Sequence, residues 1–163
     1  MRTAAIAMAM ALLITAARSE CAEITCDAVV VRDAWDLLKL ARYGRSDRER
    51  AAFVMQDAAG RHSFRAWHDQ HKLLSATYFG VLPRDAVAII HTHPNGSPYP
   101  SDGDEQVALR TGLPVYVLTR TRICRTTGHG VEHLLDGDWN PAHPRARVSS
   151  VCGTSFVSVA AAR

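Results

Sequence analysis

Short runs of hydrophobic residues, separated by polar turns, divide the chain into alternating strand-like and helix-like segments. In residues 32–43 the alanines and leucines recur at helical spacing on one face, and Gly44 follows as a stop signal. Residues 86–90, AVAII, form a continuous apolar run between polar neighbours, which is typical of a strand buried on both faces. The remaining runs predict strands at 24–31, 51–55, 63–67, 114–119 and 123–126 and a helix at 101–111.

The connecting segments group these elements around one sheet. Turn residues at 57–60 predict that the two strands flanking them pair as a hairpin. Residues 68–83 are polar and irregular and are expected to form a long loop, while 128–139 is rich in turn residues. Residues 148–163 are expected to form a C-terminal tail or an edge strand. Strands and helices therefore mix within one domain, of the α/β or α+β class.

The first 19 residues have the organisation of a signal peptide. Arg2 supplies a positive start, and residues 4–17 are apolar except for one threonine, which is too short a stretch to span a bilayer. Small residues at Ala17 and Ser19 predict cleavage after Ser19. The mature chain is then periplasmic or secreted, with no stable membrane insertion. A buried alanine-rich helix or an uncleaved anchor is the alternative.

Composition fits one domain that does not bind nucleic acid. The chain has 163 residues and is 47% hydrophobic, which is enough for a single core, and we place the domain at 24–147. The net charge of +3 falls to +1 without the predicted signal peptide, because that segment holds Arg2 and Arg18 and no acidic residue. No run of five basic residues is present to follow a phosphate backbone.

Four cysteines leave the redox state open. They form no C-x-x-C pair, which argues against a cysteine-based zinc site or a thioredoxin-like redox motif. An even count behind an export signal permits two disulfides, with three connectivities, and reduced buried thiols are the alternative. The four are Cys21, Cys26, Cys124 and Cys152.

Metal-binding chemistry is concentrated at the end of the buried strand. His91 and His93 are two positions apart, so a strand directs both imidazoles to the same side. Ser101 stands at an expected helix N-cap, and Asp104, three residues later, lies in the first helical turn. Two imidazoles and one carboxylate are three of the four ligands of an open, catalytic type of zinc site, whose fourth place holds water.

This H-x-H-x7-S-x2-D spacing resembles the signature of the JAMM (MPN-plus) zinc metalloproteases, over roughly residues 30–128. The resemblance implies that His91, His93 and Asp104 bind Zn²⁺. It implies that the Ser101 hydroxyl stabilises the oxyanion or the metal-bound water. The implied fold is α/β, a single mixed, curved β-sheet flanked by helices, with a layered arrangement like that of cytidine deaminases.

The resemblance also calls for a glutamate near the start of an early strand, where Glu49 matches. A carboxylate there takes a proton from water and returns it to the leaving nitrogen. The alternative is that Glu49 is a solvated charge in a linker, between Arg48 and Arg50.

Three other patterns are expected to be incidental. The H-x-x-E-H match at 129–133 needs a helix, which Gly128 and Gly130 disfavour, and no later glutamate exists to serve as a third ligand. The H-x-E and P-C-x-x-C motifs of zinc deaminases are absent. The glycosylation match at 95–97 lies beside the metal ligands, where a glycan would block the cleft.

The resulting hypothesis is an exported zinc metalloprotease that hydrolyses peptide or isopeptide bonds in a polypeptide substrate. Export makes a ubiquitin-type substrate a poor expectation. Tyr99 and the 68–83 loop are expected to form one wall of the substrate groove, and His68 and His71 have no assigned role. The alternatives are a non-catalytic, metal-stabilised interaction module and a toxin or effector domain that acts on a foreign protein.

Overall fold

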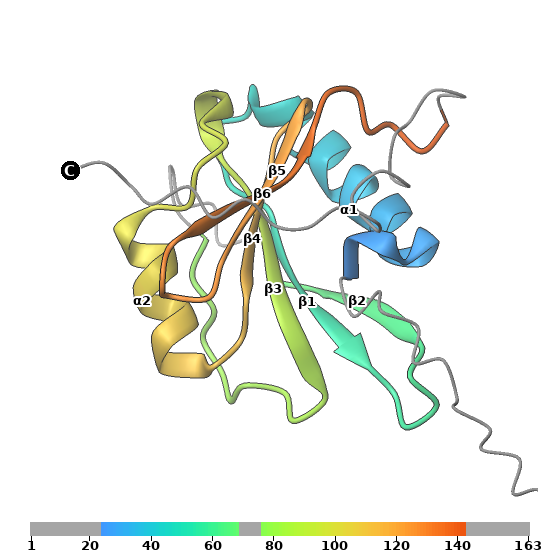
Figure 1. The fold of residues 1–163 in the computed structure, drawn as a ribbon, viewed down its shortest axis with the longest axis vertical. Coiled ribbons are helices and arrows are strands. Elements are labelled where there is room, and N and C mark those ends of the chain that lie inside the picture. Colours follow the sequence, from blue (N-terminus) through green and yellow to red (C-terminus); the bar gives the residue numbers. More distant parts are fainter. Residues whose placement is uncertain (1–23, 69–75, 143–163) are drawn as a thin grey trace, which may run out of the picture.

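A computed structural model describes residues 24–68 and 76–142 (Figure 1). Six strands form one sheet in the order β2-β1-β3-β4-β5-β6. The β3–β4 pair is parallel and the other pairs are antiparallel, so the sheet is mixed and the α/β prediction is confirmed. The strands are β1 Ala51–Gln56, β2 His62–Ala66, β3 Ala86–Thr92, β4 Val115–Leu118, β5 Arg122–Thr126 and β6 Val131–Asp136.

Two α-helices lie on opposite sides of this sheet (Figure 1). They are α1, Ala28–Leu40, and α2, Asp102–Thr111, and α2 connects the parallel strands β3 and β4. Three short 3-10 turns complete the elements: η1 Ile24–Cys26, η2 Arg42–Gly44 and η3 Pro94–Gly96. Among the described residues, no helix is long and apolar enough to cross a membrane.

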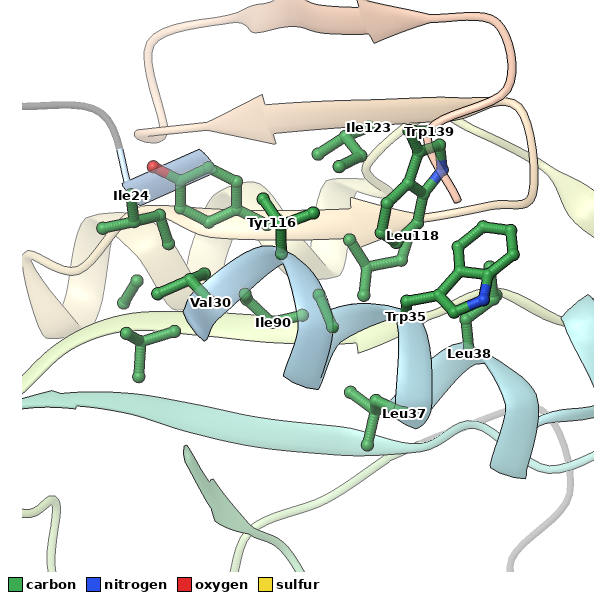
Figure 2. Close-up of a cluster of buried hydrophobic side chains, with 14 of the residues drawn as sticks. Ile24, Val30, Trp35, Leu37, Leu38, Ile90, Tyr116, Leu118, Ile123 and Trp139 are labelled. Atoms are coloured by element: carbon green, nitrogen blue, oxygen red, sulfur yellow. The ribbon is translucent and has the colours of Figure 1, made fainter. Parts of the chain in front are cut away.

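Alternation along the strands divides the core into two layers. In β1, Ala52 and Val54 face the cluster under α1, whereas Phe53 faces the cluster under α2. The α1 layer holds the two fully packed tryptophans, Trp35 and Trp139, whose rings meet edge to face at 4.8 Å (Figure 2). The buried Trp139 Nε1 donates to Thr119 O at 2.7 Å, which satisfies the polar atom that this large side chain brings into the core.

The predicted strand at 24–31 is wrong, and the helix predicted at 32–43 begins earlier. Asp27 is the N-cap of α1, because its Oδ1 accepts from the backbone N–H of Val29 and Val30. The β-branched residues that suggested a strand therefore occupy the first helical turns. There Val30 is buried in the core, and this packing overrides a weak local preference.

The turn-rich segment 128–139 contains a strand that was not predicted. β6 pairs with β5 along its whole length, and glycines with positive φ flank it at 128, 130 and 137. The structure confirms, within two residues at every end, the strands predicted at 51–55, 63–67, 86–90, 114–119 and 123–126 and the helix predicted at 101–111. The hairpin turn at 57–60 is also present, whereas 1–19 and 148–163 lie outside the described residues.

The cysteines differ in state. Cys26 is disulfide-bonded, whereas Cys124 is a free and fully buried thiol. Burial raises the pKa of Cys124 to about 11. Cys124 therefore takes no part in a disulfide and fits the alternative of a reduced small hydrophobic residue.

Candidate metal centre

The two histidines leave the sheet where β3 ends. His91 is the penultimate residue of β3, and His93 keeps an extended backbone (φ −96°, ψ 136°) just before Pro94 begins η3. Because this extended geometry preserves the alternation of side chains, both rings point to one side. Their centroids lie 4.8 Å apart at an interplanar angle of 86°.

The N-terminus of α2 brings the carboxylate. Ser101 is the N-cap, and Asp104, at the third helical position, closes a capping box with it. Asp104 Oδ2 accepts from both the Ser101 N–H and the Ser101 hydroxyl at 2.7 Å. These bonds fix the carboxylate beside the histidines, with Oδ1 3.1 Å from His91 Nε2 and Oδ2 3.4 Å from His93 Nε2.

This group of three side chains fits a metal ion. The candidate ligand atoms of His91, His93 and Asp104 all lie within 4.8 Å of one another. His91 Nε2 is buried and has no hydrogen-bond partner among the described residues, because its approach to Asp104 lacks the alignment of a hydrogen bond. Ligands of a tetrahedral zinc ion stand about 3.4 Å apart, close to the 3.1 Å between this nitrogen and Asp104 Oδ1. A cation held by these three residues would satisfy this buried nitrogen.

The electrostatics of the site favour positive charge. Burial by itself would lower the pKa of His91, but the carboxylates of Asp104 and Glu49 raise it to about 9. Burial would raise the pKa of Asp104, but His91, His93 and the Ser101 N–H hold that pKa far below its usual range. Two carboxylates around a buried imidazole therefore provide a strongly cation-attracting pocket.

Glu49 lies next to this group and is not a solvated linker charge. Its side chain is 11% exposed, and its Oε2 lies 3.5 Å from His91 Nδ1. The backbone of Arg50 exchanges hydrogen bonds with Thr92, through Arg50 N to Thr92 Oγ1 at 3.0 Å and Thr92 N to Arg50 O at 2.9 Å. This pairing sets the approach of β1 to the end of β3. The backbone N–H of Ala76 donates to Glu49 Oε2 at 2.9 Å and fixes the carboxylate from the other side.

The structure therefore brings together all five candidate residues. Glu49 lies beside His91, and Ser101 contacts the group through Asp104. Its hydroxyl donates to Asp104, so in this arrangement it orients a ligand and does not face the cleft freely. A role at the oxyanion, as the resemblance implies, requires this hydroxyl to change partner during reaction.

The five residues line a cavity of about 550 Å³. The sequence did not identify another part of its lining, where Phe53, Trp67 and Tyr78 contact one another. Part of the expected 68–83 wall is present, since five residues of the 76–82 segment contribute to the lining: Ala76, Thr77, Tyr78, Gly80 and Leu82. Tyr99 does not line this cavity, and its ring instead meets the His133 ring edge to face, with the centroids 5.4 Å apart.

The H-x-x-E-H match does not lie on a helix, as expected from its glycines. Glu132 and His133 lie in β6, and Glu132 forms a short ion pair with Arg125, whereas His129 precedes the strand in the turn after β5. The segment therefore lacks the helix that this motif needs to bring its two histidines together.

Fold and site together define an α/β domain with a candidate metal centre at the end of its central parallel strand. Comparison with known families then identifies it: the model of the prokaryotic homologs of the JAB domain matches residues 10–129, and the chain belongs to this family. Searches of curated proteins and of solved structures returned no match.

Proposed function

We propose that this chain is a zinc-dependent metallopeptidase that hydrolyses peptide or isopeptide bonds in polypeptides. The observation that carries the proposal is the buried, unpartnered His91 Nε2 facing His93 and Asp104, with the Glu49 carboxylate beside it. Membership of the JAB family supports the same reading.

In this proposal, separate side chains bind the metal, position its carboxylate ligand and transfer the proton. His91, His93 and Asp104 hold the metal, and the Ser101 hydrogen bonds keep the Asp104 carboxylate in place. Zinc, when bound, polarises the scissile carbonyl and makes water acidic enough to be activated near neutral pH. Glu49 accepts a proton from the attacking water and passes it to the leaving nitrogen. The Ala76 N–H aims the Glu49 carboxylate during both transfers.

A metal-dependence experiment tests this function. The chain is purified without chelator, its zinc is measured by mass spectrometry, and hydrolysis of a peptide library is followed with and without zinc. We expect about one zinc per chain and zinc-dependent cleavage. His93→Ala should lose both properties, whereas His133→Ala, which removes a histidine from β6 outside the site, should keep both. Wild-type protein that neither retains nor responds to zinc contradicts the proposal.

The non-catalytic alternative is separated by the same measurement. A metal-stabilised interaction module binds zinc through the same three ligands, but it does not cleave any member of the library. None of the three ligands or the adjacent Glu49 is missing in this chain, which supports the catalytic proposal.

A further inference from the structure

The cavity at the metal centre is much larger than a metal ion and water require. Its volume of about 550 Å³ lies within the usual range of ligand pockets. The five candidate residues line one part of it. The register of β1 and β3 pairs Ala51 with His91 and Phe53 with Ile89, which places an apolar part of the lining next to them, and the polar Thr77, Arg110 and Thr111 also line the cavity. We define the apolar half by Phe53, Trp67, Tyr78, Leu82, Ile89 and Val107.

Three aromatic rings from separate segments form the wall of the apolar half. Phe53 in β1 meets Tyr78 edge to face at 4.7 Å and Trp67 at 5.2 Å, and the last two rings lie 5.4 Å apart. Phe53 is fully buried, whereas Trp67 and Tyr78 are only partly buried. Val107 of α2 is likewise partly buried. The three rings therefore pack on one another, and Trp67 and Tyr78, which line the cavity, keep part of their surface exposed.

Two exposed hydrophobic side chains alternate with lining residues on the 76–82 segment. Val81 is 90% exposed and Phe79 72%, and their sequence neighbours Tyr78, Gly80 and Leu82 line the cavity. Neighbouring exposed apolar side chains beside a concave site are typical of a surface that binds an apolar partner.

This same segment is connected to the candidate base. Ala76 donates its N–H to Glu49 Oε2, and Tyr78, two residues later, belongs to the aromatic wall. The segment that carries Tyr78 therefore also holds the Glu49 carboxylate, and the aromatic wall and the candidate metal centre line the same cavity.

We propose that the apolar half binds a bulky apolar side chain of the residue next to the scissile bond, so that cleavage occurs at leucine, methionine or aromatic positions. This inference rests on the proposed peptidase function and adds its substrate class. A glycine at that position leaves the apolar surface in contact with water. Replacing it by leucine or phenylalanine buries that surface, which corresponds to a roughly 10- to 100-fold gain.

Binding and cleavage are tested separately. Blocked peptides that are identical except for Gly, Ala, Leu or Phe on either side of the intended cleavage point are titrated calorimetrically into zinc-loaded Glu49→Gln. The same peptides are then assayed for kcat/KM with the wild type. On one side of the bond, we expect Leu and Phe to exceed Gly roughly 10- to 100-fold in both series.

A pair of variants on α2 tests whether the preference for apolar peptide side chains depends on the cavity. Val107→Phe fills the apolar half, so the Phe-to-Gly ratio of affinities should fall at least about fivefold, in line with the lost burial. Leu109→Phe adds a ring to the same helix at an exposed residue outside the cavity lining, and that ratio should not change. Circular dichroism and zinc content verify that both variants fold.

The outcomes separate this inference from the proposed function. Ranked binding without any cleavage contradicts the peptidase but supports the apolar subsite. Cleavage with equal rates for Gly and Phe peptides, or with a preference for Gly, overturns the subsite and leaves the peptidase standing. Neither binding nor cleavage overturns both.

Discussion

At the scale of single residues, the two nitrogens of His91 have different surroundings. Nδ1 faces Glu49 at 3.5 Å, and Nε2 faces Asp104 at 3.1 Å without a hydrogen bond. Metal-binding histidines commonly direct their second nitrogen at a carboxylate, which fixes the tautomer. Glu49 can therefore orient His91 as well as accept a proton from water. A variant of Glu49 must be measured for both zinc content and hydrolysis rate to distinguish these two roles.

Ser101 gives a prediction at this scale. Ser101→Ala removes the helix cap and the hydroxyl bond to Asp104, so we expect the free energy of unfolding to fall by about 1 kcal/mol. Zinc affinity should fall by roughly tenfold, because Asp104 loses an orienting partner. Urea denaturation and competition with a chromogenic chelator measure the two effects. Ser101→Thr keeps a hydroxyl and should restore both; if it does not, the hydroxyl is not what positions Asp104.

The sequence could predict the metal-binding group but not all of its surroundings. Strand alternation joins His91 to His93, and the capping-box spacing joins Ser101 to Asp104, so both relations are local. The hydrogen bond between Ala76 and Glu49 spans 27 residues and starts from a segment without periodicity. No local rule predicts such a contact.

At the scale of elements, η2 supports the turn that carries His93. Gly44 has φ +79°, and a Cβ built there would lie 3.1 Å from His93 O. The preceding residues, Arg42 and Tyr43, also have positive φ, so the chain turns tightly at the end of α1 to make this approach. Glycine is required at this position both for its backbone conformation and for the space.

Gly44→Ala and Gly60→Ala form a matched pair. Both glycines have nearly equal positive φ, but a Cβ at Gly60 meets nothing within 4 Å. We expect each variant to lose about 1 kcal/mol of stability from backbone strain. Only Gly44→Ala should also weaken zinc binding, by roughly tenfold, because the His93 carbonyl must move. Equal zinc affinities in the two variants contradict the supporting role of η2.

Asp27 links α1 to β2 and gives a pH prediction. Its Oδ1 caps α1, and its Oδ2 pairs with His62 Nδ1 at 2.7 Å. Burial alone would raise the pKa of Asp27, but the bonds to His62 and to the backbone N–H of Val29 and Val30 lower it. The carboxylate therefore stabilises the fold above its unfolded pKa of 3.8, and this contribution is lost as the pH falls through the lower folded value.

Two variants measure this contribution. Asp27→Ala should lower the free energy of unfolding at pH 7 by about 1 kcal/mol. Asp27→Asn keeps a capping side chain and should lose less, and its difference from the wild type should shrink between pH 5 and pH 2. Urea denaturation over this range is the measurement. A difference that grows on acidification contradicts the sign derived for Asp27.

At the scale of the whole molecule, the sheet separates two layers. The α1 face contains both packed tryptophans, Trp35 and Trp139, and the α2 face contains the candidate metal centre and its cavity. β1 and β3 are apolar on both faces, so their sequences alone did not show which face carries which layer. The errors at 24–31 and 128–139 arose where tertiary pairing decided the structure, through packing of α1 on the sheet and pairing of β6 with β5.

Export is a prediction for the whole chain and rests on the sequence of residues 1–19. Expressed with its own N-terminus in a bacterial host, the chain should appear in the periplasm or medium and begin at Glu20. Intact-mass measurement and N-terminal sequencing of that fraction identify the first residue. Retention of the full-length chain in the cytoplasm would contradict the predicted signal peptide.

Zinc-dependent catalysis through Glu49 is the central claim, and Glu49→Gln tests it most directly. Peptide hydrolysis and zinc content are measured on the same preparations of wild type, Glu49→Gln and the control Glu105→Gln, a carboxylate of α2 outside the cavity lining. We predict equal zinc in all three proteins, an unchanged rate in the control and a loss of at least about 100-fold in Glu49→Gln. Loss of zinc from Glu49→Gln would assign Glu49 to positioning His91 instead. A zinc-loaded Glu49→Gln protein as active as the wild type would contradict the claim.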